Sequence, residues 1–287
     1  MPAKPKPAAL AAHPTTRKRL PPRFRKPFPL ISALKSAPEL NQDQGRFSSK
    51  KVKQLAESCR LNITKVNRME TGGRFPLVIA AAGRSSRFGR PKLLEVIPGQ
   101  TITLIEHVVR ECLAGDAGPI IVVLGPQASE PYGAIAARVA TAGAHPLHVD
   151  PAPEEMRRSI EHGIGYVESC LIGSPDRPPD FIGFMPADLP AIEAAFVREL
   201  IAQCRGRQES LVRGVTREGR GLHPVALRWN DRGAIAELPK DAGLNALWQN
   251  PRLSRSDFFC AFESMRHDLD NPQDWQKFPF PRDRPGE

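Results

Sequence analysis

The stretch LVIAAAGRSSRFGRPKLL, residues 77–94, decides the fold. Its apolar start is typical of a strand buried in a parallel sheet. A turn of small residues follows and is rich in cations, among them Arg84, Arg87 and Lys92. Gly83 and Gly89 permit positive φ angles, so that successive N–H groups can converge on phosphate oxygens. From the residues alone, a polyphosphate-binding turn and a solvated surface loop are equally good interpretations.

Several common nucleotide and catalytic patterns do not fit. The loop matches neither G-x-x-x-x-G-K-[ST] nor the G-x-G-x-x-G spacing of a dinucleotide-binding turn. The chain also has no G-x-S-x-G nucleophile elbow and no H-E-x-x-H helix. These observations argue against a P-loop enzyme, a dinucleotide-dependent enzyme, an α/β-hydrolase and a zinc peptidase.

Downstream of Phe75, short apolar runs alternate with segments whose apolar residues recur at helical spacing. We expect strands at 75–81, 119–124, 145–149, 181–185, 210–216, 224–229 and 257–262. We expect helices at 103–113, 132–142, 154–170, 192–204, 231–238 and 242–248. This alternation predicts one three-layer α/β domain, Rossmann-like with a mostly parallel central sheet, whose ligands lie at the carboxyl ends of the strands.

The net charge of +10 is distributed unevenly along the 287 residues. Residues 1–74 hold 17 Lys and Arg against 4 Asp and Glu, and the rest of the chain is slightly acidic. Nine prolines fall among the first 38 residues, which is incompatible with regular helix. We therefore predict a basic, Pro-rich tail or a mis-assigned start over 1–74, a domain over 75–278 and a C-terminal tail over 279–287. A nucleic-acid partner is not expected.

Cysteine usage and hydropathy bear on the compartment. The five cysteines are widely spaced and form no C-x-x-C pair, so neither a disulfide framework nor a zinc site is indicated. No apolar run approaches the roughly 18 residues that a membrane helix needs. We expect a cytoplasmic protein, monomeric or homodimeric, with no membrane partner.

The segment Ala80–Leu94 resembles the signature loop of the MobA-like nucleotidyltransferases, L-A-A-G-x-S-x-R-x-G-x-P-K. The resemblance covers about Phe75 to Trp275. It implies a fold of the nucleotide-diphospho-sugar transferase type and a loop that wraps a nucleoside triphosphate. The catalytic residues implied are Lys92, Arg87 and Asp188. The nucleotide-binding residues implied are Ala81, Ala82, Gly83, Arg84, Ser85, Arg87, Lys92 and Ser159.

Two further segments resemble the family's metal-binding elements. Residues 181–190, FIGFMPADLP, match its P-x-D-x-P element, which assigns Asp188 to a metal ion. Residues 267–275, HDLDNPQDW, are similar to its closing D-I-D-T-P-E-D element, which adds Asp270. Taken alone, Asp188 is more typical of a helix N-cap and the second segment of an ordinary turn. The resemblance implies Mg²⁺ held by both aspartates.

Two segments bear on the second substrate. Residues 219–225, GRGLHPV, resemble the family turn that borders the acceptor's pocket, which makes His223 the candidate contact with the acceptor. A structural role for this histidine is the alternative. Relatives show small residues where this chain has Arg157 and Arg158. We expect Arg158 and Ser159 to contact an anionic group and Arg157 to belong to an amphipathic helix with its cations in water. Asn245 stands where the family has an arginine, so the resemblance implies no arginine contact with phosphate there.

Together these features predict transfer of a nucleoside monophosphate from a triphosphate to a phosphorylated small molecule, with release of pyrophosphate. The A-A-G start of the loop is closer to the cytidylyltransferase branch that acts on molybdopterin than to the guanylyl branch, so CTP is favoured and GTP is possible. The alternatives are a sugar-phosphate nucleotidyltransferase, a glycosyltransferase using a nucleotide-sugar, and a non-catalytic nucleotide-binding regulator.

Overall fold

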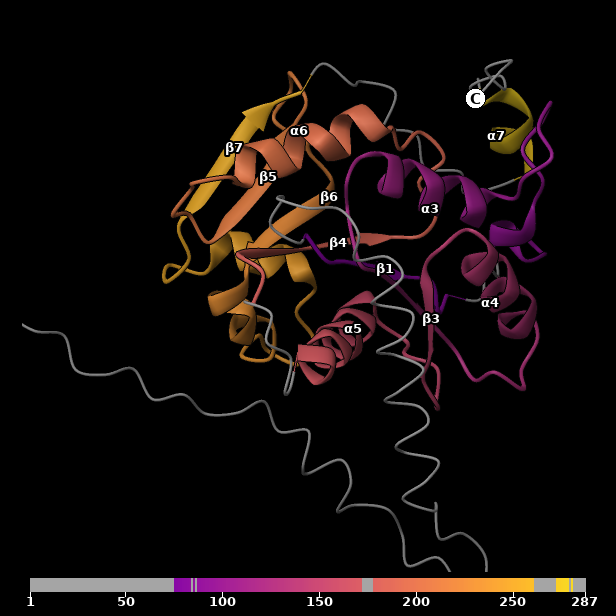
Figure 1. Ribbon diagram of the computed structural model, residues 1–287, viewed down its shortest axis with the longest axis horizontal. Helices are drawn as coiled ribbons and strands as arrows, with labels where there is room; N and C mark the ends of the chain where they lie inside the picture. Colours follow the sequence, from indigo (N-terminus) through magenta and orange to yellow (C-terminus); the bar gives the residue numbers. More distant parts are fainter. Residues whose placement is uncertain are drawn as a thin grey trace, which may run out of the picture. The chain divides into compact units, whose positions relative to one another are not determined.

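A seven-stranded sheet forms the centre of the protein (Figure 1). The computed structural model describes residues 75–83, 85, 87–171, 178–260, 272–278 and 280, which all belong to one compact unit. The strands are β1 (Leu77–Ala80), β2 (Ile120–Leu124), β3 (His145–His148), β4 (Phe181–Pro186), β5 (Leu211–Val215), β6 (Gly221–Arg228) and β7 (Arg255–Phe259). The α-helices are α3 (Leu104–Ala114), α4 (Tyr132–Thr141), α5 (Met156–Leu171), α6 (Ala194–Cys204) and α7 (Pro272–Lys277), and the short 3₁₀ helices are η1 (Lys92–Leu94), η2 (Trp229–Ile235) and η3 (Leu244–Gln249).

The sheet has the strand order β3-β2-β1-β4-β6-β5-β7. β1 lies between β2 and β4 and runs parallel to both, with Leu77 opposite Ile120 on one side and Gly183 on the other. β3 is parallel to β2, and β7 is parallel to β5, whereas β6 is antiparallel to its two neighbours. The predicted three-layer fold with a mostly parallel sheet is therefore confirmed.

Helices cover both faces of the sheet and enclose two apolar cores. One core joins the sheet to α3, α4 and α6, and the other joins it to α5, η2 and η3. In Figure 1, α3 and α6 lie above the sheet and α5 lies below it. The alternation of side chains along a strand explains the division, since Leu77 and Ile79 enter the first core and Val78 enters the second.

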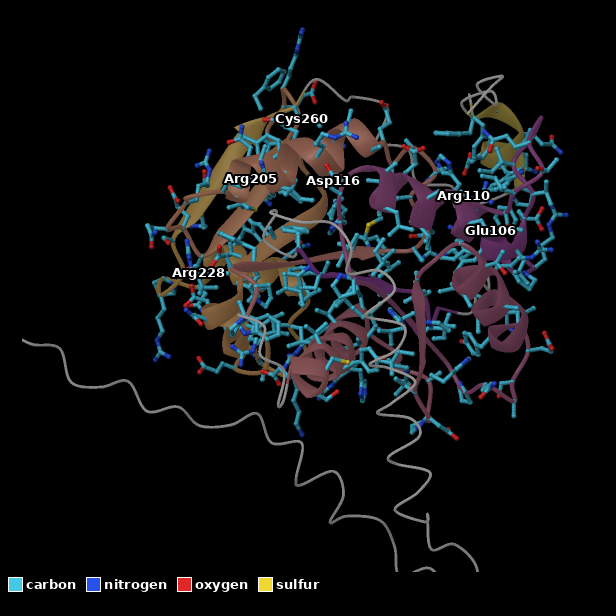
Figure 2. The ribbon with its side chains drawn as sticks, viewed as in Figure 1. Glu106, Arg110, Asp116, Arg205, Arg228 and Cys260 are labelled. Carbon is cyan, nitrogen blue, oxygen red and sulfur yellow. The ribbon has the colours of Figure 1, made fainter. Side chains whose placement is uncertain are left out.

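The start of α3 shows how local sequence specifies a helix. Thr103 precedes the helix and forms a capping box with Glu106. The Thr103 backbone N–H donates to the Glu106 carboxylate at 2.8 Å, and the Thr103 hydroxyl donates to it at 2.7 Å. Such a box satisfies N–H groups that the first helical turn leaves unpaired. Figure 2 labels Glu106 near the start of α3.

A buried histidine connects α3 to the segment that follows β4. The Nε2 atom of His107 lies 3.1 Å from the carbonyl oxygen of Pro190. Because a carbonyl only accepts, Nε2 carries the proton and donates it. Burial lowers the pKa of His107 below its usual value, although the nearby charge of Glu111 acts in the opposite direction. The imidazole is thus held neutral in the core.

α5 approaches β1 very closely at a glycine. A Cβ atom built on Gly163 would lie 2.3 Å from a methyl carbon of Val78, a distance that real Cβ atoms do not show. Ile160 and Ile164 flank this point and are fully buried, as predicted for the apolar face of this helix. The absence of a side chain at residue 163 therefore sets the distance between the helix and the sheet.

The structure corrects the sequence-based expectation in three places. Both segments predicted as helices between β6 and β7 are 3₁₀ helices, and each contains at most seven residues. This geometry is common in short connectors. β6 begins at Gly221, earlier than predicted, because Leu222 and His223 continue the strand. The predictions for residues 1–74 lie outside the described residues and stay predictions.

Neither a membrane helix nor a disulfide framework is expected from the sequence, and the described part of the chain bears on both. Within those ranges, none of the helices combines the length and the apolar character required to cross a membrane. The four cysteines there are free, and Figure 2 labels one of them, Cys260, just beyond β7.

Replacing Gly163 by alanine tests the close approach of α5 to β1. We expect Gly163→Ala to lower the free energy of unfolding by about 1–3 kcal/mol, because the added methyl overpacks a filled core. The matched control is Gly233→Ala in η2, where a Cβ would meet nothing within 4 Å. Urea denaturation of the two variants and the wild type measures both effects. Equal stability of the two variants would show that α5 can move away from Val78 without cost.

His107 predicts a specific pH dependence of stability. The unfolded chain takes up a proton on this side chain near its ordinary pKa of about 6.5, whereas the folded protein resists protonation until lower pH. The free energy of unfolding should therefore fall as pH decreases below about 6.5. In His107→Gln, which keeps an N–H donor, the fall should be smaller. Denaturant titrations at pH 7.5 and 5.5 measure the free energy of unfolding of both proteins. An equal loss of this free energy between the two pH values in His107→Gln and the wild type would contradict the prediction.

Candidate active site

The segment after β1 forms a turn that leads into η1. The Ala81 N–H donates to the carbonyl of Val123 at 2.9 Å, which extends the pairing with β2 by one residue. The chain then turns, with the Phe88 N–H donating to the carbonyl of Ser85 at 3.0 Å. Ser85 (φ 50°) and Gly89 (φ 75°) have positive φ, and Gly83 does not. Gly89 thus adopts the positive φ that its residue type permits, whereas Ser85, and not Gly83, supplies the earlier left-handed position of the turn.

An ion pair joins this loop to the end of β4. The Lys92 Nζ lies 3.0 Å from Oδ2 of Asp188, although 96 residues separate them in the chain. The Lys92 side chain is 9% exposed, whereas that of Asp188 is 46% exposed. The carboxylate thus remains open to solvent or to a ligand while the ammonium is buried. The parallel pairing of β1 with β4 places both residues at one edge of the sheet.

A cavity of about 310 Å³ opens beside this ion pair. Eight of the residues predicted for the site line it: Ala81, Ala82, Gly83, Ser85, Arg87, Lys92, Ser159 and Asp188. They come from the carboxyl ends of β1 and β4 and from the start of α5, as the strand topology requires. The volume lies within the range of roughly 300–1,000 Å³ that is typical of small-molecule sites.

Another part of the cavity wall is formed by the start of α5 and the residues before it. Ser159 is 2% exposed and faces the cavity from the first turn of the helix. Glu154, Glu155 and Met156 line the same wall. The cavity therefore has cations on the loop side and carboxylates on the helix side, which is a charge distribution suited to a polyanion accompanied by a metal ion.

Neither arginine of α5 lines this cavity. Arg157 is 5% exposed, and its guanidinium donates to the Glu161 carboxylate at 3.0 Å and to the carbonyl of Pro239 at 2.6 Å. The expectation that its charge lies in water is wrong, because the carboxylate and the carbonyl replace water as its partners. Arg158 is exposed and pairs with Glu161 at 2.7 Å. Its predicted contact with an acceptor stays a prediction.

His223 lies on β6, next to the end of β4. Burial lowers the pKa of this histidine, against the smaller effects of a hydrogen bond with the Phe184 backbone and the charge of Asp188. Its Nδ1 atom is buried and has no hydrogen-bond partner among the residues that the structure describes. His223 does not line the 310 Å³ cavity. The side chain is thus close enough to Asp188 for the charge of that carboxylate to affect its pKa.

Two predicted residues, Arg84 and Asp270, lie outside the described residues. The end of the segment that contains Asp270 is described, however, because α7 begins at Pro272. The ring of Trp275 packs edge-on against Phe88 with 6.2 Å between centroids, and Phe88 lines the cavity. The structure therefore brings the end of this segment against the loop that carries Lys92.

The residues around the cavity suit a hard divalent cation. Among the described residues, no group of three or more His, Cys, Asp or Glu side chains is gathered as a metal site. Mg²⁺ does not require one, because it is usually held by one or two carboxylates together with phosphate and water oxygens. Asp188, Glu154 and Glu155 offer carboxylates to the cavity. Asp188 is a suitable ligand because its Oδ2 atom contacts Lys92 while its side chain is 46% exposed, which leaves carboxylate oxygen open to a metal ion.

Two side chains that were not identified from the sequence donate hydrogen bonds to the backbone of the loops after β1 and β4. The Tyr132 hydroxyl donates to the carbonyl of Ala82 at 2.5 Å, and His107 donates to the carbonyl of Pro190. Both side chains lie on helices and are buried. Their positions fit the apolar pattern of α4 and α3, so the pattern contains no signal for these contacts.

Comparison with known proteins agrees with this geometry. The family model described as the MobA-like NTP transferase domain matches residues 77–256, and thus ends before the segment with Asp270. A search of curated proteins found no match.

Solved structures share the fold. A homolog of Rv0371c from Mycobacterium sp. strain JC1 is 26% identical, with 71% of this chain and 93% of that chain covered and a TM-score of 0.55. The nucleotidyl transferase Mth528 from Methanothermobacter thermautotroptrophicus is 20% identical, with 71% and 95% covered and a TM-score of 0.56. Rv0371c from Mycobacterium tuberculosis H37Rv, solved as a complex with manganese, is 19% identical, with 72% and 98% covered and a TM-score of 0.51.

The family match spans more than half of the chain and contains the glycine-and-cation loop, the strand β4 and the ion pair between them. The similarity of this chain to the solved structures extends over nearly the whole length of each of them. The chain therefore belongs to the MobA-like NTP transferase family and is a nucleotidyltransferase.

Proposed function

We propose that this enzyme transfers CMP from CTP to a phosphorylated small-molecule acceptor such as molybdopterin, with Mg²⁺ as the metal and pyrophosphate as the second product. The observation that carries the proposal is the Lys92–Asp188 pair at the edge of a 310 Å³ cavity. It combines a buried cation, which suits a triphosphate, with a half-exposed carboxylate, which suits a metal ion.

The reaction requires an anionic oxygen of the acceptor to attack the α-phosphorus while pyrophosphate leaves. Positioning and charge neutralisation supply most of the catalysis in such transfers, so a covalent nucleophile is not needed. In this proposal Arg87 and Lys92 bind the triphosphate and neutralise the charge that builds on the departing pyrophosphate. The amide groups of Ala82 and Gly83 add neutral donors on the same side of the cavity.

The metal ion would be held by Asp188 together with Asp270. When bound, Mg²⁺ would neutralise part of the negative charge on the phosphate oxygens. Asp188 has two functions in this scheme, since its carboxylate both faces the metal and orients the Lys92 ammonium at 3.0 Å. Manganese in a protein of similar fold supports a divalent cation in general, and Mg²⁺ is the specific proposal.

The preference for CTP rests on the Ala81-Ala82-Gly83 start of the loop, which is closer to the cytidylyltransferase branch than to the guanylyl branch. The proposed contact with the acceptor is made by His223. The charge of Asp188 affects the pKa of this histidine, and its Nδ1 atom has no partner among the described residues. Transfer to a sugar phosphate is the alternative within the same class. A cytoplasmic location, inferred from the cysteine pattern, is part of the proposal.

A panel of triphosphates tests the nucleotide preference. We expect CTP with Mg²⁺ to raise the melting temperature of the protein more than GTP, ATP or UTP at equal concentration, because a ligand that binds only the native state stabilises it according to occupancy. Pyrophosphate release with molybdopterin as acceptor should follow the same order. A larger shift with GTP would contradict the proposed preference, and binding without release would contradict this acceptor.

Replacing Lys92 tests the proposed role of its charge. Lys92→Met keeps the length of the side chain and removes the ammonium, and we expect turnover to fall by on the order of 100- to 1,000-fold, as for other lost transition-state contacts. The fold should persist, because Asp188 is half exposed and water can replace its partner. The matched control is Lys240→Met, since Lys240 is exposed and lies outside the cavity lining. The measurements are pyrophosphate release and thermal melting; unchanged turnover in Lys92→Met would refute the mechanism.

A further inference from the structure

A tyrosine outside the cavity holds one peptide group of its loop. The hydroxyl of Tyr132, the first residue of α4, donates to the carbonyl oxygen of Ala82 at 2.5 Å. Tyr132 is 3% exposed and Ala82 is 5% exposed, so water does not compete for this bond. Tyr132 is absent from the lining of the 310 Å³ cavity, whereas Ala82 and Gly83 are part of it. The bond therefore holds the loop from the side away from the cavity.

The geometry of the peptide bond gives this contact a consequence at the neighbouring residue. The carbonyl of Ala82 and the N–H of Gly83 belong to one planar peptide group, and in a trans peptide they point in opposite directions. With the carbonyl directed at Tyr132, the Gly83 N–H is directed to the opposite side. Within the described residues this N–H has no hydrogen-bond acceptor, and a Cβ built on Gly83 would meet nothing within 4 Å. Gly83 thus brings to the cavity lining an N–H donor that has no partner within the described ranges of the chain.

The position of the Tyr132 ring is restricted by its close contact with Gly125. A Cβ atom on Gly125, the residue after β2, would lie 2.2 Å from a ring carbon of Tyr132. The ring therefore passes directly over the end of β2, and only glycine at position 125 leaves room for it. The carbonyl of Gly125 in turn accepts a hydrogen bond from Nδ1 of His148 at 2.8 Å. Residues at the ends of two neighbouring strands thus fix the place of the hydroxyl.

We propose that Tyr132 is a positioning residue that orients the Ala82–Gly83 peptide so that the Gly83 N–H donates to a phosphate oxygen of the nucleoside triphosphate. This proposal rests on the proposed function, in which the cavity binds a triphosphate. An N–H that is held in place before the ligand arrives binds an anion more tightly than one that must first rotate, because no ordering cost remains. Without the hydroxyl, the Ala82–Gly83 peptide loses the hydrogen bond that holds its carbonyl oxygen on the side away from the cavity.

The test compares the two tyrosines of the chain. Tyr132→Phe removes the hydroxyl and keeps the ring above Gly125, and Tyr166→Phe on α5 is the matched control outside the cavity lining. The probes are inorganic tripolyphosphate and CTP, each with Mg²⁺, measured by calorimetry. We expect Tyr132→Phe to bind both probes about tenfold more weakly than the wild type, which corresponds to the loss of one hydrogen bond to a charged group. Tyr166→Phe should bind both like the wild type.

A second readout separates positioning from a general effect on stability. In ¹⁵N-labelled wild type and Tyr166→Phe, the Gly83 amide resonance should move on addition of tripolyphosphate, and in Tyr132→Phe this movement should be lost or reduced. Gly125→Ala, which keeps the hydroxyl but displaces the ring, should weaken tripolyphosphate binding in the same way. A lower melting temperature of Tyr132→Phe with wild-type affinity for tripolyphosphate would overturn the proposal. Absence of binding to the wild type would instead remove the proposed function, and the inference with it.

Discussion

The active site depends on the position of β1 inside the sheet, with parallel neighbours on both sides. Because β1 and β4 end at the same edge of the sheet, a lysine from the loop after β1 meets an aspartate from the loop after β4 at 3.0 Å. Burial gives this contact its weight, since the Lys92 ammonium loses most of its water and an anionic oxygen takes the place of that water. In the resting protein the anion is Asp188, and in the proposed reaction the triphosphate joins it.

Two helices on the same face of the sheet support the two loops of this site from behind. Tyr132 on α4 donates to a carbonyl of the loop after β1, and His107 on α3 donates to a carbonyl of the loop after β4. In both cases a buried side chain binds the oxygen of a peptide group rather than the ligand. The cavity side of each loop is thereby left free for binding. Preorganisation of this kind places donors before the substrate arrives, which is the main source of catalysis in phosphate transfer.

Much of this structure follows from patterns in the sequence. Continuous apolar runs such as Ile120–Leu124 predicted the parallel strands, and the family resemblance named eight of the residues that line the cavity. The failures have physical causes. The turn at Ser85 depends on a backbone conformation that residue type did not indicate, and Arg157 is buried because Pro239, far along the chain, supplies an acceptor. The contact of Tyr132 with Ala82 joins residues on separate elements, and no local periodicity encodes such a pair.

The contact between Phe88 and Trp275 links the beginning of the domain to its end, since the two rings are separated by most of the folded sequence. Trp275 also packs against Phe280, so that the final turn of the domain forms a small aromatic cluster beside the nucleotide loop. During synthesis on the ribosome, the loop emerges first and its aromatic partner emerges last. The loop therefore acquires its contact with Trp275 only after the chain has been translated through that residue.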